Sequence, residues 1–182
     1  MTPAHAAGAR PSESGAEWIV VSVREATTPE DLAVAADLFR EYARWLPFAL
    51  DFQDFEEELS SFPSHYAGPA GCVLIGHVDG ALAGCVALRP LSEGICEMKR
   101  LYVRPEARGR GAGRALAEAV LTRAREIGYD RMRLDTLRSM EAANALYRSL
   151  GFREIEPYCE NPFPDACFFE IRLGGAHDSE GP

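Results

Sequence analysis

Residues 108–114 read Arg-Gly-Arg-Gly-Ala-Gly-Arg, and no other segment of the chain indicates its chemistry so clearly. The segment lies between a predicted strand at 95–103 and a predicted helix at 112–127. Glycines at alternate positions let the backbone bend and let another molecule approach it closely. The first turn of the helix adds unpaired N–H groups and the positive end of the helix dipole. We therefore expect the turn to bind an anion, most naturally a phosphate or a diphosphate.

Several cationic side chains surround this turn: Lys99, Arg100, Arg104, Arg108, Arg110 and Arg114. Glu106 is the only acid close to them in the sequence. The whole chain carries a formal net charge of −9, so the cationic concentration is local. We interpret the segment as a phosphate-binding corner. The overall acidity argues against binding to nucleic acid or to an anionic membrane surface.

Two familiar nucleotide-binding loops do not fit this segment. The P-loop requires Gly-Lys followed by Ser or Thr, whereas Lys99 is the only lysine of the chain. The dinucleotide fingerprint requires a third glycine where Leu116 stands. An ordinary strand-to-helix turn with solvated arginines stays open as the alternative.

The first half of the chain contains a predicted strand and a predicted helix. Alternating residues at 18–27 indicate the strand. Thr28 has the character of an N-cap, with Pro29 at the first helical position, and the apolar helical stripe stops before Pro47. A second, shorter helix is predicted at 53–60.

A meander of three strands is predicted next. Apolar residues at 72–78 and 81–88 flank Asp79-Gly80, which is a strong signal for a two-residue hairpin turn. A third strand follows at 95–103 and leads into the phosphate-binding corner.

Helices and strands alternate in the last part of the chain. The helix at 112–127 ends at Gly128, and a strand follows at 131–137. Ser139 is expected to cap the next helix, which runs to Leu150. Closing strands are predicted at 152–155 and 166–173.

These elements predict an α/β (α+β mixed) domain. We expect a mixed, largely antiparallel twisted sheet of six to seven strands with helices on both faces. The domain spans residues 18–173, between flexible tails at 1–17 and 174–182. No apolar run approaches the length of a transmembrane helix.

The cysteines and histidines indicate neither disulfides nor a metal site. The chain has five cysteines: Cys72, Cys85, Cys96, Cys159 and Cys167. An odd number without a Cys-x-x-Cys pair indicates reduced thiols and a cytoplasmic protein. The histidines lack metal-ligand spacing: His5, His65, His77 and His177.

Residues 93–152 resemble the GNAT superfamily of acetyl-CoA-dependent N-acetyltransferases. The matching pieces are Lys-Arg-Leu-Tyr-Val at 99–103, Arg-x-x-Gly-x-Gly at 108–113 and Leu-Tyr-Arg-Ser-Leu-Gly-Phe at 146–152. Their order and combination are more specific than any one of them. The resemblance implies a GNAT-like fold and acetyl-CoA as cosubstrate, without a metal ion.

The resemblance also implies where acetyl-CoA binds. Loop amides hold the diphosphate, and backbone groups of the preceding strand bond the pantetheine arm and the acetyl carbonyl. The cofactor-binding positions are Leu101, Tyr102, Val103, Arg108, Gly109, Arg110, Gly111, Ala112, Gly113 and Arg114. Met140 stands where many relatives have an asparagine, and Asn144 lies one turn further on.

Glu97 and Tyr147 are the candidate catalytic residues. Glu97 matches a catalytic glutamate of the histone-acetylating branch and is expected on the same strand face as Leu101. There it would take the proton of an amine whose pKa is about 10. Tyr147 aligns with the tyrosine that faces the cofactor sulfur and would protonate the thiolate. The alternative for Glu97 is a solvated strand carboxylate, or one paired with Lys99 on the same face. The alternative for Tyr147 is a packed aromatic ring.

The acceptor is expected against the first helices and a late proline-rich loop, at Tyr42, Trp45, Phe48, Gln53, Tyr158 and Asn161. Aromatic side chains there would clasp a small primary amine or an amino-acid-like molecule. A protein N-terminus or lysine, or a catalytically silent acyl-CoA sensor, are the alternatives. The sequence leaves a homodimer open.

Overall fold

The computed structural model describes residues 5–11, 18–46, 62, 66 and 68–174. Within this part of the chain, one sheet of eight strands has the order β1-β2-β3-β4-β5-β6-β8-β7. The strands are β1 (His5–Pro11), β2 (Trp18–Glu25), β3 (Cys72–Val78), β4 (Ala81–Ser92), β5 (Ile95–Val103), β6 (Arg131–Leu137), β7 (Arg153–Ile155) and β8 (Ala166–Arg172). The helices are α1 (Pro29–Trp45), α3 (Ala112–Ile127) and α4 (Glu141–Ser149), with a short 3-10 helix at Pro105–Ala107.

The sheet confirms the predicted fold class, but it has eight strands, one more than the upper end of the predicted six to seven. β5 and β6 are parallel, whereas the other neighbouring strands are antiparallel. The extra strand is β1, which pairs with β2 and lies inside the stretch expected to be a flexible tail. His5–Pro11 pairs with β2 within that stretch, since backbone pairing does not need an apolar sequence. Residues 1–4, 12–17 and 175–182 of the tails, and the helix predicted at 53–60, lie outside the described residues.

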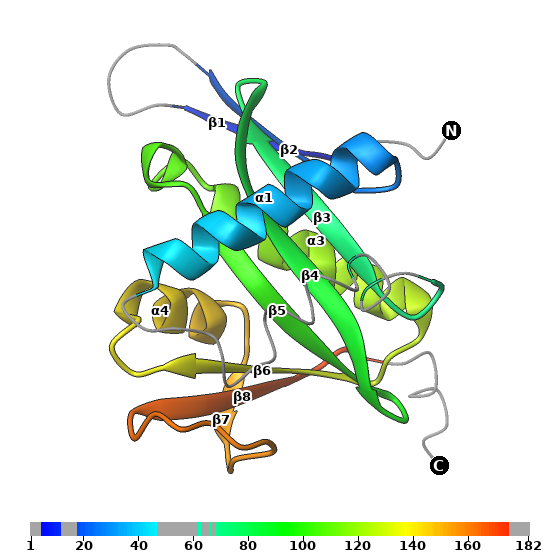
Figure 1. Ribbon diagram of the computed structural model, residues 1–182, viewed down its shortest axis with the longest axis vertical. Helices are drawn as coiled ribbons and strands as arrows, with labels where there is room; N and C mark the ends of the chain where they lie inside the picture. The colour runs from blue at the N-terminus through cyan, green and yellow to red at the C-terminus, as the bar shows by residue number, and fades with distance from the viewer. Residues whose placement is uncertain (1–4, 12–17, 47–61, 63–65, 67, 175–182) are drawn as a thin grey trace, which may run out of the picture.

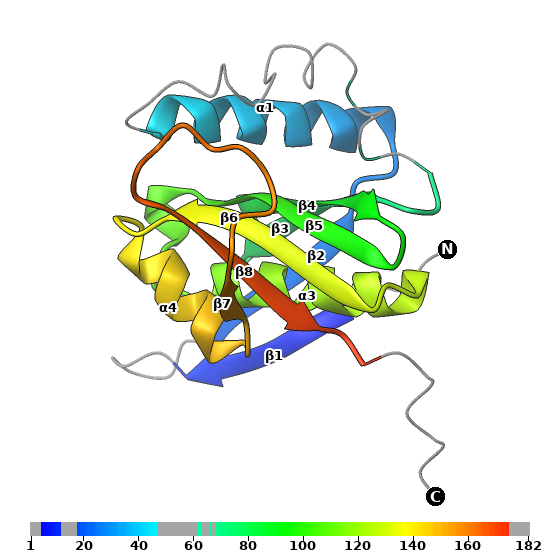
Figure 2. The same ribbon diagram turned by 90° about the horizontal axis from the view of Figure 1, so that it is seen from below.

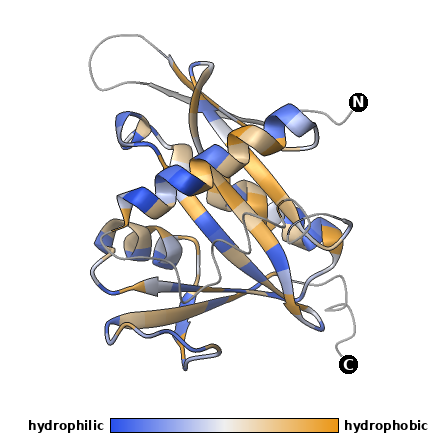
Figure 3. Cartoon of the chain, in the orientation of Figure 1, coloured by the Kyte–Doolittle hydropathy of each residue, from blue (hydrophilic) through white to orange (hydrophobic). Residues whose placement is uncertain are grey.

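The helices cover the two faces of the sheet (Figures 1 and 2). α1 packs against β3, β4 and β5 on one face, whereas α3 packs against β2 to β5 on the other. Each face has its own core cluster. Phe39 of α1 is fully buried in one cluster, and Leu116 of α3 is fully buried in the other. The central strands are largely hydrophobic, and the visible side of α1 is mostly hydrophilic (Figure 3). The described helices are all too short or too polar to cross a membrane.

Two helix starts show where the local signals hold and where they fail. The Thr28 hydroxyl accepts a hydrogen bond from the Asp31 amide at 3.2 Å, so the predicted N-cap of α1 is confirmed. The predicted cap of α4 is wrong. Its N-cap is Met140, and the Ser139 hydroxyl instead donates to the Asp165 carboxylate at 2.9 Å.

A bulge in β5 decides which side chains reach which face. Cys85 pairs with Tyr102 and Ala87 pairs with Lys99, so two residues of β5, Arg100 and Leu101, oppose a single residue of β4 between these pairs. Arg100 absorbs the extra residue with φ at +57°, a conformation that a non-glycine residue rarely adopts. The alternation of side chains is reset at this point.

The predicted common face of Glu97 and Leu101 is therefore wrong. Glu97 and Lys99 lie on the α1 side of the sheet, where Ala87 joins the α1 core. Leu101 packs instead with the α3 core, and Tyr102 returns to the α1 side. Odd-numbered residues of β5 therefore face the α1 layer before the bulge and the α3 layer after it.

Gly84 of β4 makes this bulge sterically feasible. A Cβ atom at Gly84 would lie 2.1 Å from the Tyr102 carbonyl oxygen, and backbone cannot yield as a side chain does. We expect Gly84→Ala to lower the free energy of unfolding by about 3 kcal/mol in a denaturant titration. Gly76→Ala is the matched control, because Gly76 pairs with Gly84 and the atoms nearest to its Cβ would belong to the Leu116 side chain, at 3.2 to 3.3 Å. Equal losses in the two variants would show that the bulge contact is not the cause.

Candidate functional site

β5 and β6 separate after Glu97 and Arg133, the last pair in their ladder. We call this place the fork. The two strands diverge from it toward the side on which α4 lies (Figure 1). A cavity of about 790 Å³ opens at the fork, and α1, β5, β6, α3 and α4 all contribute to its wall. Its size suits a ligand of many atoms.

Most of the predicted site residues line this one cavity: Tyr42, Trp45, Leu101, Val103, Arg108, Gly109, Gly111, Ala112, Gly113, Tyr147 and Asn161. They come from segments more than a hundred residues apart. The residues of the glycine-rich turn thus share a wall with residues proposed for the acceptor.

The glycine-rich turn has the geometry expected of an anion-binding corner. Gly109 and Gly111 have φ of +73° and +89°, which favour glycine. Gly111 is the N-cap of α3, where no side chain caps the helix and no acid stands in the first turn. A Cβ atom at Gly113 would make only ordinary contacts with Val103 and Leu146, at 3.5 and 3.8 Å, and Gly113 lines the cavity. Open backbone amides at a helix start fit a diphosphate.

The arginines near the corner are more fully neutralised than the sequence predicts. Arg104 forms a two-point ion pair with Glu41 at 2.6 and 2.9 Å. Arg110 pairs with Asp79. Glu106 is the only acid near these cations in the sequence, and the fold brings the distant acids Glu41 and Asp79 to them.

Two further arginines differ in where their side chains lie. Arg114 donates to the Ser149 hydroxyl at 2.6 Å, and its side chain lies outside the cavity wall. Arg108 lines the cavity, where its guanidinium stacks 4.5 Å from the centre of the Trp45 ring. The Arg108 Nε also donates to the Val103 carbonyl at 3.1 Å. Arg108 is therefore the arginine of the motif that lines the cavity.

Tyr147 lies in the cavity wall on α4, with its ring packed against Phe152 and Phe169 at 5.8 and 6.2 Å between ring centres. Its hydroxyl makes no hydrogen bond to any described residue. Burial, followed by the nearby groups Tyr42 and Asp135, raises the pKa of Tyr147 above its ordinary value. The phenol is therefore protonated at neutral pH and available as a donor.

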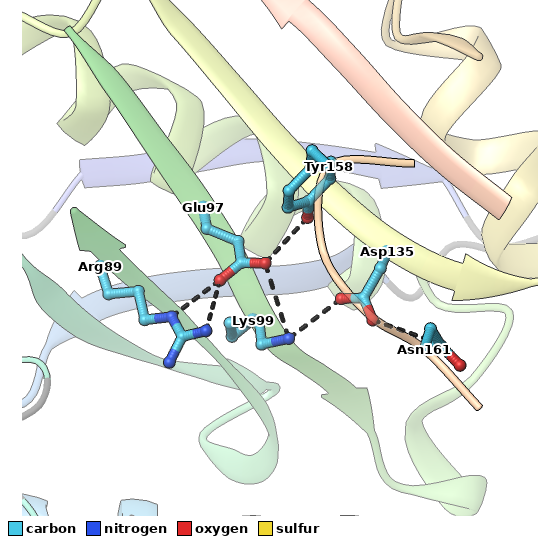
Figure 4. Close-up of polar contacts among 6 residues, drawn as sticks. All are labelled: Arg89, Glu97, Lys99, Asp135, Tyr158 and Asn161. Carbon is cyan, nitrogen blue, oxygen red and sulfur yellow. Dashed lines mark hydrogen bonds and ion pairs between the residues drawn. The ribbon is translucent and has the colours of Figure 1, made fainter. Parts of the chain in front are cut away.

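Glu97 is absent from the cavity wall and is 1% exposed. Figure 4 shows the side chains that surround its carboxylate. Arg89 donates to its Oε2 at 2.7 Å, and the Tyr158 hydroxyl donates to its Oε1 at 2.8 Å. The Lys99 ammonium lies 3.6 Å from Oε1. Glu97 thus anchors other side chains and does not itself line the cavity.

Lys99 and Asp135 are the polar residues that the sequence did not single out as catalytic. Lys99 Nζ lies 3.0 Å from Asp135 Oδ1, and Asn161 donates to Asp135 Oδ2 at 3.1 Å (Figure 4). Both residues line the cavity, two positions beyond the last pair of the β5–β6 ladder. Burial acts to raise the pKa of Asp135, but the charge and hydrogen bond of Lys99 and the Asn161 amide outweigh it, so the pKa is lowered. Asp135 is ionised at neutral pH.

The remaining acceptor candidates divide into three groups. Tyr42 and Trp45 lie in the cavity wall, beside the buried Tyr102 ring at 5.9 and 6.3 Å between centres. Tyr158 is drawn away to Glu97, and burial, followed by the Glu97 charge, raises its pKa. Phe48 and Gln53 lie outside the described residues.

The asparagine after β6 has a structural partner. Asn144 is 4% exposed and donates to the Leu137 carbonyl at 2.8 Å, so it holds α4 to the end of β6. Met140 lines the cavity at the position where many relatives carry an asparagine. Asn144 itself does not line the cavity.

A family model described as the acetyltransferase (GNAT) family matches residues 35–152, which is more than half of the chain. The chain belongs to the GNAT family. This agrees with the eight-stranded fold, with the fork between β5 and β6, and with the glycine-rich turn at the start of α3. It makes the protein an acyltransferase.

Individual GNAT proteins are similar over most of the chain. An uncharacterized N-acetyltransferase of Schizosaccharomyces pombe is 37% identical over 155 residues, covering 84% of this chain and 95% of that protein. The N-acetylaspartate synthetase of Rattus norvegicus is 34% identical over 124 residues, covering 63% of this chain and 42% of that protein.

Solved structures of this family share the fold. A putative acetyltransferase from Salmonella typhimurium, determined with its cofactor acetyl-CoA, superposes with a TM-score of 0.67 at 20% identity. The match covers 85% of this chain and 94% of that one. In the part of this chain that the structure describes, no group of His, Cys, Asp and Glu side chains could hold a metal ion.

Proposed function

We propose that this GNAT protein transfers the acetyl group of acetyl-CoA to the primary amine of a small or amino-acid-like acceptor by direct attack. The observation that carries the proposal is the single cavity at the fork. The anion-binding corner, the Tyr147 hydroxyl and the Asp135 carboxylate all face it. The name of the N-acetylaspartate synthetase, a similar protein, supports an amino-acid-like acceptor.

Each part of the cavity has a role in this reaction. Acetyl-CoA supplies an acetyl group activated as a thioester. Amides of the corner at Gly109 to Gly113 would hold its diphosphate, as the open start of α3 allows. Backbone groups of β5 near Leu101 would hold the carbonyl oxygen and stabilise the negative charge that develops there.

Proton transfers complete the mechanism. The new bond forms between the amine nitrogen and the acyl carbon, and the carbon–sulfur bond breaks. We assign the removal of the amine proton to Asp135, which meets the amine. The Lys99 ammonium lies between the two carboxylates, so it can take that proton from Asp135 while it passes one of its own to Glu97. Tyr147 donates its proton to the departing sulfur.

Thiol release from acetyl-CoA over an amine panel tests the proposed function. The panel contains free amino acids, simple amines, and peptides with a free N-terminus or an internal lysine. We expect the fastest release with a small acceptor. Faster release with the peptides would favour a protein acetyltransferase, and acetyl-CoA binding without any release would favour a silent sensor.

Gly113→Leu tests the position of acetyl-CoA directly. Gly113 lies in the first turn of α3 in the cavity wall, so a leucine there would fill the space expected for the cofactor without backbone strain. We expect calorimetry to show acetyl-CoA affinity lowered at least about 10-fold, the cost of losing one or two charge-assisted hydrogen bonds. Glu118→Leu is the control, because Glu118 lies on α3 with its side chain outside the wall. Unchanged affinity in Gly113→Leu would place the cofactor elsewhere.

A further inference from the structure

Lys99 is unusual in this chain before its contacts are considered. It is the only lysine among 19 basic residues, and it is 8% exposed. Everywhere else the chain uses arginine, whose guanidinium is a planar fork, whereas an ammonium is a compact point charge with three donors. The single lysine lies in the wall of the cavity, at the fork.

The contacts of Lys99 fix its ammonium at one point. It lies 3.0 Å from Asp135 Oδ1 and 3.6 Å from Glu97 Oε1. Arg89 and Tyr158 hold Glu97 from behind, and Asn161 holds Asp135. Because each partner is itself held, the ammonium and the Asp135 carboxylate present a fixed pair of opposite charges to the cavity (Figure 4).

This pair lies close to where the acyl group is expected. Lys99 precedes the Arg100 bulge by one residue and Leu101 by two. Asp135 is also near enough to Tyr147 for its charge to act on the phenol. An acceptor bound to the pair would therefore have its nitrogen near the reacting carbon.

The charges of the pair select among acceptors. A simple amine bound at Asp135 as an ammonium ion would face the Lys99 ammonium, and two like charges repel each other at such distances. An acceptor with a carboxylate beside its amine would place that carboxylate on Lys99 and remove the repulsion. A charge-assisted hydrogen bond of this kind is also a strong one.

We propose that the Lys99–Asp135 pair is the acceptor-binding element and that it selects a free amino acid, with the ammonium on Asp135 and the carboxylate on Lys99. This inference rests on the proposed function and assigns the acceptor class to the same site. The two residues distinguish amines by whether the carbon next to the nitrogen carries a carboxylate.

Matched acceptors test the selection. The pairs are alanine with ethylamine, phenylalanine with phenethylamine, and lysine with cadaverine, so that each pair differs at the carboxylate. We expect kcat/KM to favour the amino acid at least about 10-fold in each pair, mainly through KM, as a hydrogen bond to a charged group predicts. Efficient acetylation of the amines without a carboxylate overturns the inference and leaves the proposed function intact. No transfer to any amine overturns both.

Substitutions at Lys99 locate the selection. Lys99→Met is expected to reduce the preference for the amino acid to within about 3-fold, whereas Lys99→Arg retains most of it because the charge stays. Arg40→Met is the control for loss of a cation. Arg40 is exposed and paired with Asp37 on α1, so the preference should not change. A preference that persists in Lys99→Met overturns the inference.

The single lysine also provides a readout that does not depend on turnover. Protein grown with ¹³C-labelled lysine has one side-chain Cε signal, which reports on Lys99 alone. With coenzyme A present, alanine is expected to shift that signal and ethylamine to leave it nearly unchanged. If Lys99→Met fails to fold, this measurement and the wild-type preference decide. Equal shifts with both acceptors overturn the inference.

Discussion

Tyr147→Phe is expected to lower kcat about 10²-fold while acetyl-CoA affinity stays unchanged. Removing one preorganised donor from a developing negative charge typically has an effect of this size. The Tyr147 hydroxyl faces the cavity and bonds no described residue, so its loss leaves no partner unsatisfied. The ring itself packs against Phe152 and Phe169, and phenylalanine keeps those contacts. Steady-state kinetics together with calorimetry on acetyl-CoA measure the two quantities.

Tyr129→Phe is the matched control for this variant. The Tyr129 hydroxyl donates to the Ala70 carbonyl at 2.7 Å, outside the cavity. Its removal should lower the free energy of unfolding by about 1 kcal/mol and leave turnover unchanged. Turnover of Tyr147→Phe equal to that of the wild type, with cofactor affinity retained, would exclude the acid role.

The site is predictable from the sequence where its signals are local. The glycine-rich turn, the helix that follows it and the Thr28 cap each depend on residues within a few positions of one another. Backbone conformation decides these features, and glycine, proline and threonine report on it directly. The structure accordingly places the turn at the start of α3, as predicted.

The polar network at the fork depends on pairing between distant segments. Lys99 and Asp135 meet because β5 and β6 are neighbours in register, and Tyr158 reaches Glu97 from a loop 61 residues away in sequence. Nothing local to Asp135 distinguishes it from any strand carboxylate. The one signal that was available is the use of lysine at a single position in an arginine-rich chain.

The Arg100 bulge explains a second limit of sequence analysis. Strict alternation would carry the face of Glu97 on to Leu101, and one inserted residue reverses that inference for the rest of the strand. The glycine opposite the bulge, Gly84, is visible in the sequence. Its meaning appears only when β4 is placed beside β5, because Gly84 makes room for the Tyr102 carbonyl.

Glu97→Gln is expected to lower the acetylation rate about 10²-fold at pH 7, the usual contribution of a general base. The loss should shrink as the pH rises toward about 10, because an aliphatic amine then gives its proton to solvent without help. The variant also leaves Arg89 and Lys99 without the charge of their partner, at a cost of up to about 3 kcal/mol. Rates are therefore measured across the pH range at a temperature where a melting curve shows the variant folded.

The shape of the pH profile separates a role in proton transfer from a purely structural one. If Glu97 only holds Arg89 and Lys99 in place, the loss is the same at every pH, because acceptor protonation plays no part in it. Asp31→Asn is the control. Asp31 forms an ion pair with Arg24 at 2.5 Å at the end of α1 far from the cavity, so its substitution removes an ion pair without changing the cavity wall. That variant should reproduce a loss of stability with a normal rate. A near-normal rate of Glu97→Gln at every pH would leave Asp135 as the carboxylate of the network that acts on the amine.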